Sequence, residues 1–129
     1  MTSNVERWLD LYRVAWETRD ADAAAALFTE DASYRDQPYE EAYLGRAGVH
    51  EYWTKVTATQ SDVRFRTGKP IVDGDRAAVE WWVTLKNDGF ELTLAGEFYL
   101  VFEGDLVREL REYWHFGEGH RTPPAGWGS

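Results

Sequence analysis

The spacing of apolar residues changes once along this chain, near residue 60, and this change limits the folds that the chain can form. Before residue 60, apolar residues recur every three or four positions, as on one face of a helix. After it they alternate with polar residues, as on a strand with one buried face. Helices therefore come first and strands follow, which predicts an α+β fold with helices on one face of a sheet.

Three helices are expected in the first half of the chain. Ser3-Asn4-Val5-Glu6 has the pattern of a capping box, which starts a first helix. Asp20 can cap a short second helix over Ala21 to Phe28, and a third helix is expected from Arg46 to about Thr57. The apolar stripe of the first helix predicts that its Tyr12 points inward: Val5, Trp8, Leu9, Tyr12, Ala15 and Trp16. The third helix has a shorter stripe, made of Val49, Trp53 and Val56.

A brief strand at residues 31–34 and a four-stranded antiparallel meander after Ser61 complete the expected fold. Turns at residues 73–75, 87–89 and 103–105 separate the strands of the meander. The last strand, Leu106 to Phe116, has no clean apolar row, so either Glu112 or His115 could face the helices. The rows expected to face the helices are Ala77, Val79, Trp81, Val83 and Leu85 on one strand and Phe90, Leu92, Leu94, Gly96, Phe98, Leu100 and Phe102 on the next.

Length and composition limit the organisation and the partners of the chain. Its 129 residues suffice for one domain, expected at residues 1–116, with a Gly/Pro-rich tail at 117–129 that Trp127 could anchor. The net charge of −9 has the wrong sign for a nucleic-acid-binding protein. Without cysteine, an apolar leader or a long apolar run, the chain is expected to be cytoplasmic and not membrane-bound.

Aromatic residues make up 16% of the chain, which suits either a thick core or a lined cavity. The outer, convex face of the predicted sheet is also more apolar than a solvated face requires. A homodimer formed through that face would cover its apolar residues, which are Trp82, Ala95, Tyr99 and Val101.

Two sequence segments carry a resemblance to a known family. Leu27-Phe28-Thr29-Glu30-Asp31-Ala32 precedes the short strand, and Arg111-Glu112-Tyr113-Trp114 lies in the last strand. With the order of elements, they resemble the SnoaL-like branch of the nuclear transport factor 2-like superfamily over about Val5 to His115. The resemblance implies a cone-shaped, curved antiparallel sheet wrapped over three N-terminal helices, the cystatin-like fold. Because the superfamily includes isomerases, cyclases, dehydratases, epoxide hydrolases and members with no known reaction, the fold does not specify one activity.

The resemblance to ketosteroid isomerase implies two candidate catalytic residues. Tyr12 falls at the position of its hydrogen-bond donor to the enolate oxygen, and Asp36 falls at the position of its proton-shuttling base. The second donor of that enzyme would fall near Gly96 to Phe98, where no acidic residue faces inward. The sequence departs from the isomerase pattern at that point.

The resemblance to limonene epoxide hydrolase implies a further pair of residues. Tyr34 matches its water-activating set, and Glu112 stands where that enzyme has an aspartate in the terminal strand. Trp81 and Val83 replace its arginine and second aspartate, so epoxide hydrolysis by that mechanism is not expected. The match places Glu112 and Trp114 on the cavity side of the last strand.

Each candidate also has a purely structural interpretation. Tyr12 could be a core tyrosine with a satisfied hydroxyl. The two carboxylates could pair with neighbouring cations, Asp36 with Arg35 or Arg46 and Glu112 with Arg108 or Arg111. An inward Glu112 would instead have a raised pKa, in the range of a general acid.

The sequence thus predicts a small-molecule pocket protein that could act on an apolar carbonyl or hydroxyl compound by acid/base catalysis, without a cofactor. Asp36 would be the base, Tyr12 the donor, and Glu112 or Tyr34 the second polar group. The expected pocket lining is Tyr34, Trp53, Trp81, Phe98 and Trp114. No metal site is expected, since His50, His115 and His120 do not have the spacing of a ligand set. The alternatives are a non-catalytic ligand-binding or dimerising module and a cone filled by its own tryptophans.

Overall fold

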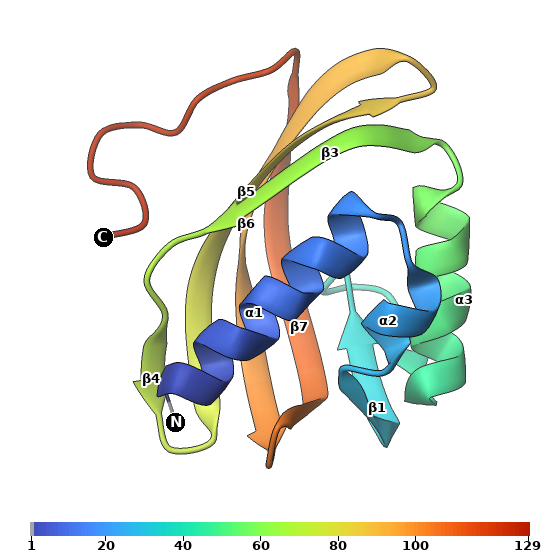
Figure 1. The fold of residues 1–129 in the computed structure, drawn as a ribbon, viewed down its shortest axis with the longest axis vertical. Helices are drawn as coiled ribbons and strands as arrows, with labels where there is room; N and C mark the ends of the chain where they lie inside the picture. Colours follow the sequence, from blue (N-terminus) through green and yellow to red (C-terminus); the bar gives the residue numbers. More distant parts are fainter. Residues whose placement is uncertain (1) are drawn as a thin grey trace.

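The computed structural model describes residues 2–129, and in this part of the chain three helices pack on one face of a curved, open sheet (Figure 1). The helices are α1 (Thr2–Glu17), α2 (Ala21–Ala25) and α3 (Gly45–Thr57). The strands are β1 (Phe28–Arg35), β2 (Tyr43–Leu44), β3 (Gln60–Thr67), β4 (Ile71–Asp73), β5 (Arg76–Asn87), β6 (Phe90–Glu103) and β7 (Leu106–Glu118). The predicted α+β class is confirmed.

The apolar residues predicted to line the inner faces of the helices are largely buried. All six apolar residues of the α1 stripe are buried, and the side chain of Asp20 caps α2 by accepting a hydrogen bond from the main chain of Ala23. The prediction that α2 reaches Phe28 is wrong, because the chain pairs with β7 from Phe28 onward and is therefore extended there. The predicted capping box depends on the Ser3 side chain, which lies outside the described residues.

The sheet has seven strands in the order β2-β1-β7-β6-β5-β3, with β4 paired to β5. The meander of β3, β5, β6 and β7 is antiparallel as predicted, but β1 runs parallel to β7, so an entirely antiparallel sheet is a wrong prediction. The parallel pairing is possible because α3 and the meander separate the two strands in the sequence. It brings the end of β1 beside the middle of β7.

The core lies between the helices and the concave face of the sheet. The predicted row on β5 is buried from Ala77 to Leu85, and Phe98, Leu100 and Phe102 are buried on β6. Phe90 was predicted to face the core but is exposed, because the β5–β6 hairpin extends past the helices (Figure 1). No helix within residues 2–129 has the combination of length and apolar character that a membrane span requires.

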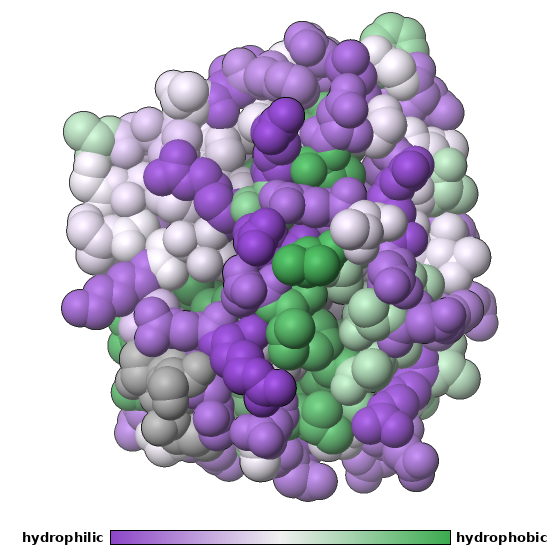
Figure 2. All heavy atoms as spheres, viewed as in Figure 1, coloured by the Kyte–Doolittle hydropathy of each residue, from purple (hydrophilic) through white to green (hydrophobic). Residues whose placement is uncertain are grey.

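The surface seen from the side of α1 is mostly hydrophilic, with a strip of hydrophobic atoms near its middle (Figure 2). On α1 itself, Leu11 and Val14 are the large apolar side chains that remain exposed. They lie three residues apart on the helix, beside charged neighbours such as Asp10 and Arg13. Scattered apolar residues of this kind are usual on a protein surface.

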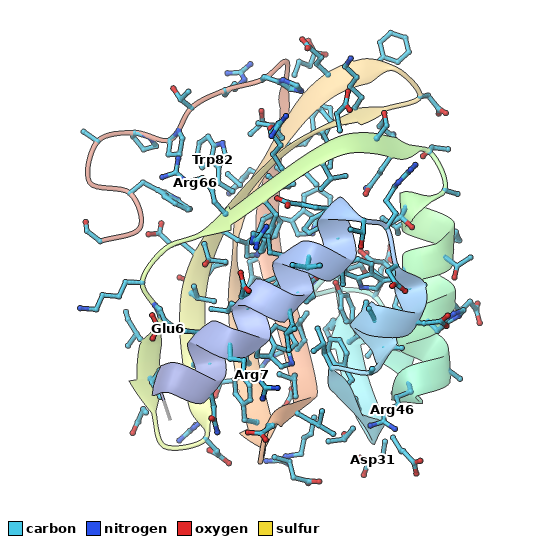
Figure 3. All side chains as sticks on the ribbon, in the orientation of Figure 1. Glu6, Arg7, Asp31, Arg46, Arg66 and Trp82 are labelled. Atoms are coloured by element: carbon cyan, nitrogen blue, oxygen red, sulfur yellow. The ribbon has the colours of Figure 1, made fainter. Side chains whose placement is uncertain are left out.

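The C-terminal segment folds back over the outer face of β5 and β6. The indole of Trp82 donates a hydrogen bond to the main-chain oxygen of Arg121, and the ring of Trp127 packs edge-on against Trp82. Arg66 lies over the Trp127 ring, and Figure 3 shows Arg66 and Trp82 beside this segment. Strand β7 continues two residues beyond its predicted end, to Glu118. The division into a domain and a tail at residue 116 stays a prediction.

Candidate functional site

A cavity of about 460 Å³ lies between α3, the β1–β2 loop and the concave face of β5, β6 and β7. Its walls include Asp36, Tyr12 and Glu112 and four of the five predicted lining residues, Tyr34, Trp53, Trp81 and Trp114. Its other walls are formed by Trp16, Gln37, Glu40, Tyr52, Val56, Thr57, Gln60, Leu85, Asn87, Leu92, Leu94 and Phe116. Residues that are distant in the sequence therefore share one cavity.

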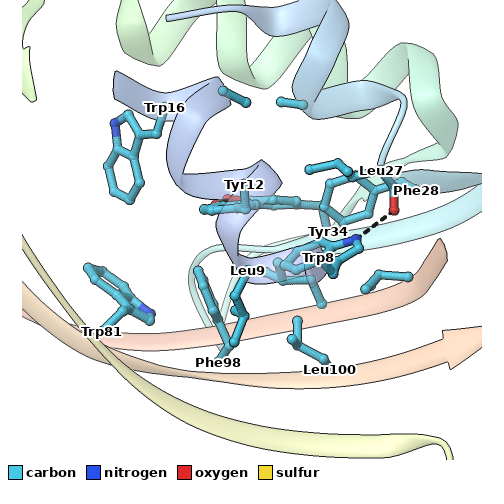
Figure 4. Close-up of a cluster of buried hydrophobic side chains, with 14 of the residues drawn as sticks. Trp8, Leu9, Tyr12, Trp16, Leu27, Phe28, Tyr34, Trp81, Phe98 and Leu100 are labelled. Carbon is cyan, nitrogen blue, oxygen red and sulfur yellow. Dashed lines mark hydrogen bonds between the residues drawn. The ribbon is translucent and has the colours of Figure 1, made fainter. Parts of the chain in front are cut away.

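Phe98 is the predicted lining residue that does not line the cavity. It lies behind Trp81 and Tyr12, with ring centroids 5.4 and 5.2 Å from theirs, and is fully buried (Figure 4). Trp16, Trp53 and Phe65 join these rings in a continuous aromatic cluster. The cone is thus filled by aromatic side chains at its inner end and open near its mouth.

A chain of hydroxyl and carboxyl groups connects α1, β1 and β7. The hydroxyl oxygens of Tyr12 and Tyr34 are 2.9 Å apart, and the Tyr34 hydroxyl lies 3.5 Å from one carboxyl oxygen of Glu112. Burial raises the pKa of both tyrosines well above 10.0, so they keep their protons near neutral pH. Tyr12 is buried, its hydroxyl has a hydrogen-bond partner, and the residue lines the cavity.

Glu112, and not His115, is the residue of β7 that faces the helices. Its side chain is only 5% exposed, whereas His115 is exposed. The cations that could have neutralised Glu112 pair with other acids, Arg108 with Asp75 and Arg111 with Glu109. Burial without a cation raises the pKa of the Glu112 carboxyl well above 4.5, and the charge of Asp36 raises it further. Glu112 therefore favours its protonated form, in which a carboxyl group can donate a hydrogen bond.

Asp36 follows β1 directly and lies at the wall of the same cavity. Its main-chain oxygen accepts a hydrogen bond of 3.0 Å from the Trp114 indole, which fixes the chain at this point. Neither neighbouring arginine pairs with its carboxylate: Arg35 donates to the main-chain oxygen of Glu40, and Arg46 to that of Phe28. Partial burial raises the pKa of Asp36 from 3.8, against the lowering effect of the Tyr52 hydroxyl.

Tyr52 is a site residue that the sequence analysis missed. It lies on α3 and lines the cavity, and its hydroxyl lowers the pKa of the Asp36 carboxyl. Burial raises the pKa of its hydroxyl well above 10.0, so it too keeps its proton near neutral pH. The signal was present, because Val49, Tyr52, Trp53 and Val56 have the i, i+3, i+4, i+7 spacing of one helix face.

A buried carboxyl group lies on the strand next to the β6 position at which the sequence departs from the isomerase pattern. Phe98 occupies the inward position on β6, and its direct cross-strand partner on β7 is Glu112. The two side chains are therefore at the same level of the sheet and on the same face. Within residues 2–129, no three histidine or acidic side chains come together in the way that a metal ion requires.

The model of the SnoaL-like domain family matches residues 5–110. No curated protein matches the chain by sequence. Among solved structures, a hypothetical protein of Catenulispora acidiphila with a ketosteroid isomerase-like fold, in complex with trimethylamine, shares 18% identity over 82% of this chain and 83% of its own, with a TM-score of 0.75.

Two further solved structures have the same fold. An epoxide hydrolase/cyclase-like enzyme of pyran ring formation in salinomycin shares 20% identity over 88% of this chain and 94% of its own, with a TM-score of 0.76. An epoxide hydrolase of Mycobacterium tuberculosis that is similar to limonene epoxide hydrolase shares 13% identity over 88% of this chain and 84% of its own, with a TM-score of 0.74. By the extent of the family match, the chain belongs to the SnoaL-like domain family.

Proposed function

We propose that this protein is a cofactor-independent acid/base enzyme that acts on an apolar carbonyl or hydroxyl compound. One observation carries the proposal: a buried carboxyl group with only a hydroxyl partner, Glu112, and a partly buried carboxylate, Asp36, line the same cavity. Two acids in different environments can hold different protonation states at one pH, which is the arrangement that acid/base catalysis requires.

The proposed reaction begins with ionised Asp36 as the base. Asp36 takes a proton from a carbon beside the substrate carbonyl, and the electron pair of that C–H bond moves toward the carbonyl oxygen. Protonated Glu112 donates a hydrogen bond to this oxygen, and the hydroxyls of Tyr12 and Tyr34 support it. In a substrate with a C=C bond one carbon further from the carbonyl, a β,γ-unsaturated compound, the electron pair returns from the oxygen through the resulting dienolate, and Asp36 delivers the proton to the γ-carbon while the C=C bond moves next to the carbonyl. The net result is an isomerisation without any change of oxidation state.

An apolar substrate is supported by the cavity walls. Apart from the carboxyl groups and a few amide and hydroxyl groups, the walls are aromatic and aliphatic. The volume of about 460 Å³ is in the range of known small-molecule sites, roughly 300–1,000 Å³. A small molecule, trimethylamine, is bound in one of the similar structures.

The test is exchange of carbon-bound hydrogen with solvent. Cyclic ketones such as cyclohexanone and 2-tetralone are incubated with the protein in D₂O, and deuterium uptake beside the carbonyl is followed by NMR. Asp36→Asn should slow the protein-catalysed exchange by about 10²–10⁴-fold while leaving the folding temperature unchanged. Asp105→Asn, which changes an exposed aspartate in the β6–β7 turn, is the matched control.

Two outcomes would contradict the proposal. Exchange that is no faster than in buffer for every ketone would refute the proposed activity. Exchange that persists in Asp36→Asn would refute the assignment of Asp36 as the base. Binding of the ketones without exchange would identify a ligand-binding module instead.

We also propose a homodimer through the convex face of the sheet. Tyr113 is half exposed on this face, and Tyr99 is its partly buried neighbour beneath Arg111. The chain's own C-terminal segment covers Trp82, and Val101 is buried, so the free apolar surface is smaller than the sequence suggested. Tyr113→Glu should then produce monomers in light scattering, and an unchanged mass would oppose this interface.

A further inference from the structure

The cavity walls have an unusual charge composition. They contain three carboxylic acids, Asp36, Glu40 and Glu112, together with the rings of tryptophan, tyrosine and phenylalanine. Among the described residues that form the walls there is no arginine, lysine or histidine. Carboxylates repel an anionic ligand, and the faces of aromatic rings carry negative electrostatic potential. The composition therefore disfavours anions and favours a positively charged group.

Glu40 is the acid that has no task in the proposed reaction. It lies on the β1–β2 loop at the mouth of the cavity, where its side chain is exposed. Arg35 contacts only its main-chain oxygen, and no described lysine or arginine forms an ion pair with its carboxylate. The ring of Trp114 lines the same cavity and is only partly buried. The ring of Tyr52 also lines the cavity, but it packs against Tyr34 and Tyr43, with ring centroids 4.8 and 4.7 Å away.

Two buried indole groups provide independent evidence that the cavity is built for a ligand. Trp53 and Trp81 line the cavity and are only 3% and 1% exposed. A buried polar group usually has its hydrogen-bonding capacity filled. Here the indole nitrogens of both residues have no hydrogen-bond partner among the described residues, and an acceptor on a ligand would satisfy them.

We propose that the ligand of this cavity is an apolar compound that carries a protonated amine, with the amine held by the Glu40 carboxylate and the ring of Trp114. Ammonium groups bind to the faces of aromatic rings, most strongly to tryptophan, and a carboxylate at the rim adds charge attraction. This assignment rests on the proposed function, because it places the carbonyl or hydroxyl end of the same molecule against Asp36 and Glu112. Glu40 is then a specificity residue and takes no part in proton transfer.

The test compares three probes of the same shape and different charge. Cyclohexylamine, cyclohexanol and cyclohexanecarboxylate are titrated at neutral pH, and binding is followed by calorimetry and tryptophan fluorescence. The amine should bind about tenfold more tightly than the alcohol, and the carboxylate should bind most weakly. Glu40→Gln should remove most of the advantage of the amine and leave binding of the alcohol unchanged. Glu41→Gln, an exposed acid one residue further along that does not line the cavity, is the matched control.

The possible failures are distinguishable. Binding of the alcohol as tightly as the amine, an unchanged preference in Glu40→Gln, or no binding of the amine up to its solubility would each overturn the amine assignment. In the first two cases the proposed reaction stands if Asp36-dependent deuterium exchange is observed. Selective binding of the amine together with an absence of exchange would refute the reaction and leave the ligand class in place.

Discussion

Glu112 is the residue at which the site differs most from an ordinary protein interior. It lies beside Trp81, Trp114 and Phe98, where an ionised carboxylate without a cation is strongly disfavoured. The folded protein therefore holds a proton on Glu112 at pH values where the unfolded chain has already lost it. Folding and protonation of this residue are thus linked.

This linkage predicts a pH-dependent stability that Glu112→Gln should remove. The stability that comes from the proton is fully present below the unfolded pKa, near 4.5, and is lost as the pH rises through the raised folded pKa. One proton contributes at most about 1.4 kcal/mol per pH unit. In urea unfolding from pH 4 to pH 9, the free energy of unfolding of Glu112→Gln should rise relative to that of the natural protein as the pH increases. The exposed Glu103→Gln is the control, and parallel curves for the natural protein and Glu112→Gln would contradict the assignment.

The residues of the site were predictable to different degrees. The stripe on α1 predicts that Tyr12 points inward, and the family resemblance assigns a role to it and to Asp36. The inward position of Glu112 depends on which row of β7 faces the helices, and its mixed pattern does not decide that. Glu40 carries no sequence signal, because its place at the cavity depends on the path of an irregular loop.

At the scale of elements, strands β5, β6 and β7 shape the floor of the cavity, and Gly96 is the point where they come closest. A Cβ atom at this position would lie 2.5 Å from the main-chain oxygen of Tyr113, 2.7 Å from the Cβ of Trp114 and 2.8 Å from the ring of Trp81. Glycine is therefore required here because there is no room for a Cβ atom, and not because of the backbone conformation. It allows the two tryptophans to lie on either side of one strand position.

We expect Gly96→Ala to destabilise the protein and to disturb the cavity at the same time. Overpacking of this kind costs about 1–3 kcal/mol, because backbone and two large rings would have to move. Chemical denaturation gives the stability, and titration with cyclohexanol reports on the cavity. Gly117→Ala on β7 is the comparison, since its added methyl group meets only the flexible side chain of Arg121. Equal stability of the two variants would show that the strands can separate at little cost.

The predicted elements were most accurate where the pattern is local. Alternation along β5 and β6 predicts their buried rows, and the three-residue turns predict their antiparallel pairing. The parallel pairing of β1 with β7 has no local signal, because it joins segments separated by α3 and the whole meander. The end of α2 was also mispredicted for this reason, since tertiary pairing overrides the helix preference of the residues before Phe28.

At the scale of the whole molecule, the C-terminal segment packs on the outer face of the sheet and links parts of that face to one another. Besides the contacts of Trp127, the main chain of Gly128 donates to the carboxylate of Glu80 and accepts from the main chain of Lys69. The segment thus joins β5 to the connection between β3 and β4. It lies on the face opposite to the cavity, so its contacts stabilise the sheet without closing the site.

Trp127→Ala should therefore weaken the fold and leave ligand binding intact. The lost ring contacts with Trp82 and Arg66 are expected to lower the free energy of unfolding by about 1–2 kcal/mol. Urea unfolding measures this loss, and Thr122→Ala, at an exposed position in the same segment, should have little effect. A change in cyclohexanol affinity in Trp127→Ala would show that the segment also influences the cavity.

The parallel β1–β7 pairing has a kinetic consequence. It positions Glu112 against Tyr34, two residues that are 78 positions apart, so the site is made by one of the contacts of highest sequence separation in the fold. Such contacts pay a large loop-closure entropy and raise the contact order, which slows folding. During synthesis on the ribosome, helices and early hairpins can form while the cavity is still incomplete, because Glu112 is synthesised after the Tyr34 hydroxyl partner that it faces. Binding of cyclohexanol in the cavity should then appear as the final event of refolding, after the secondary structure is complete.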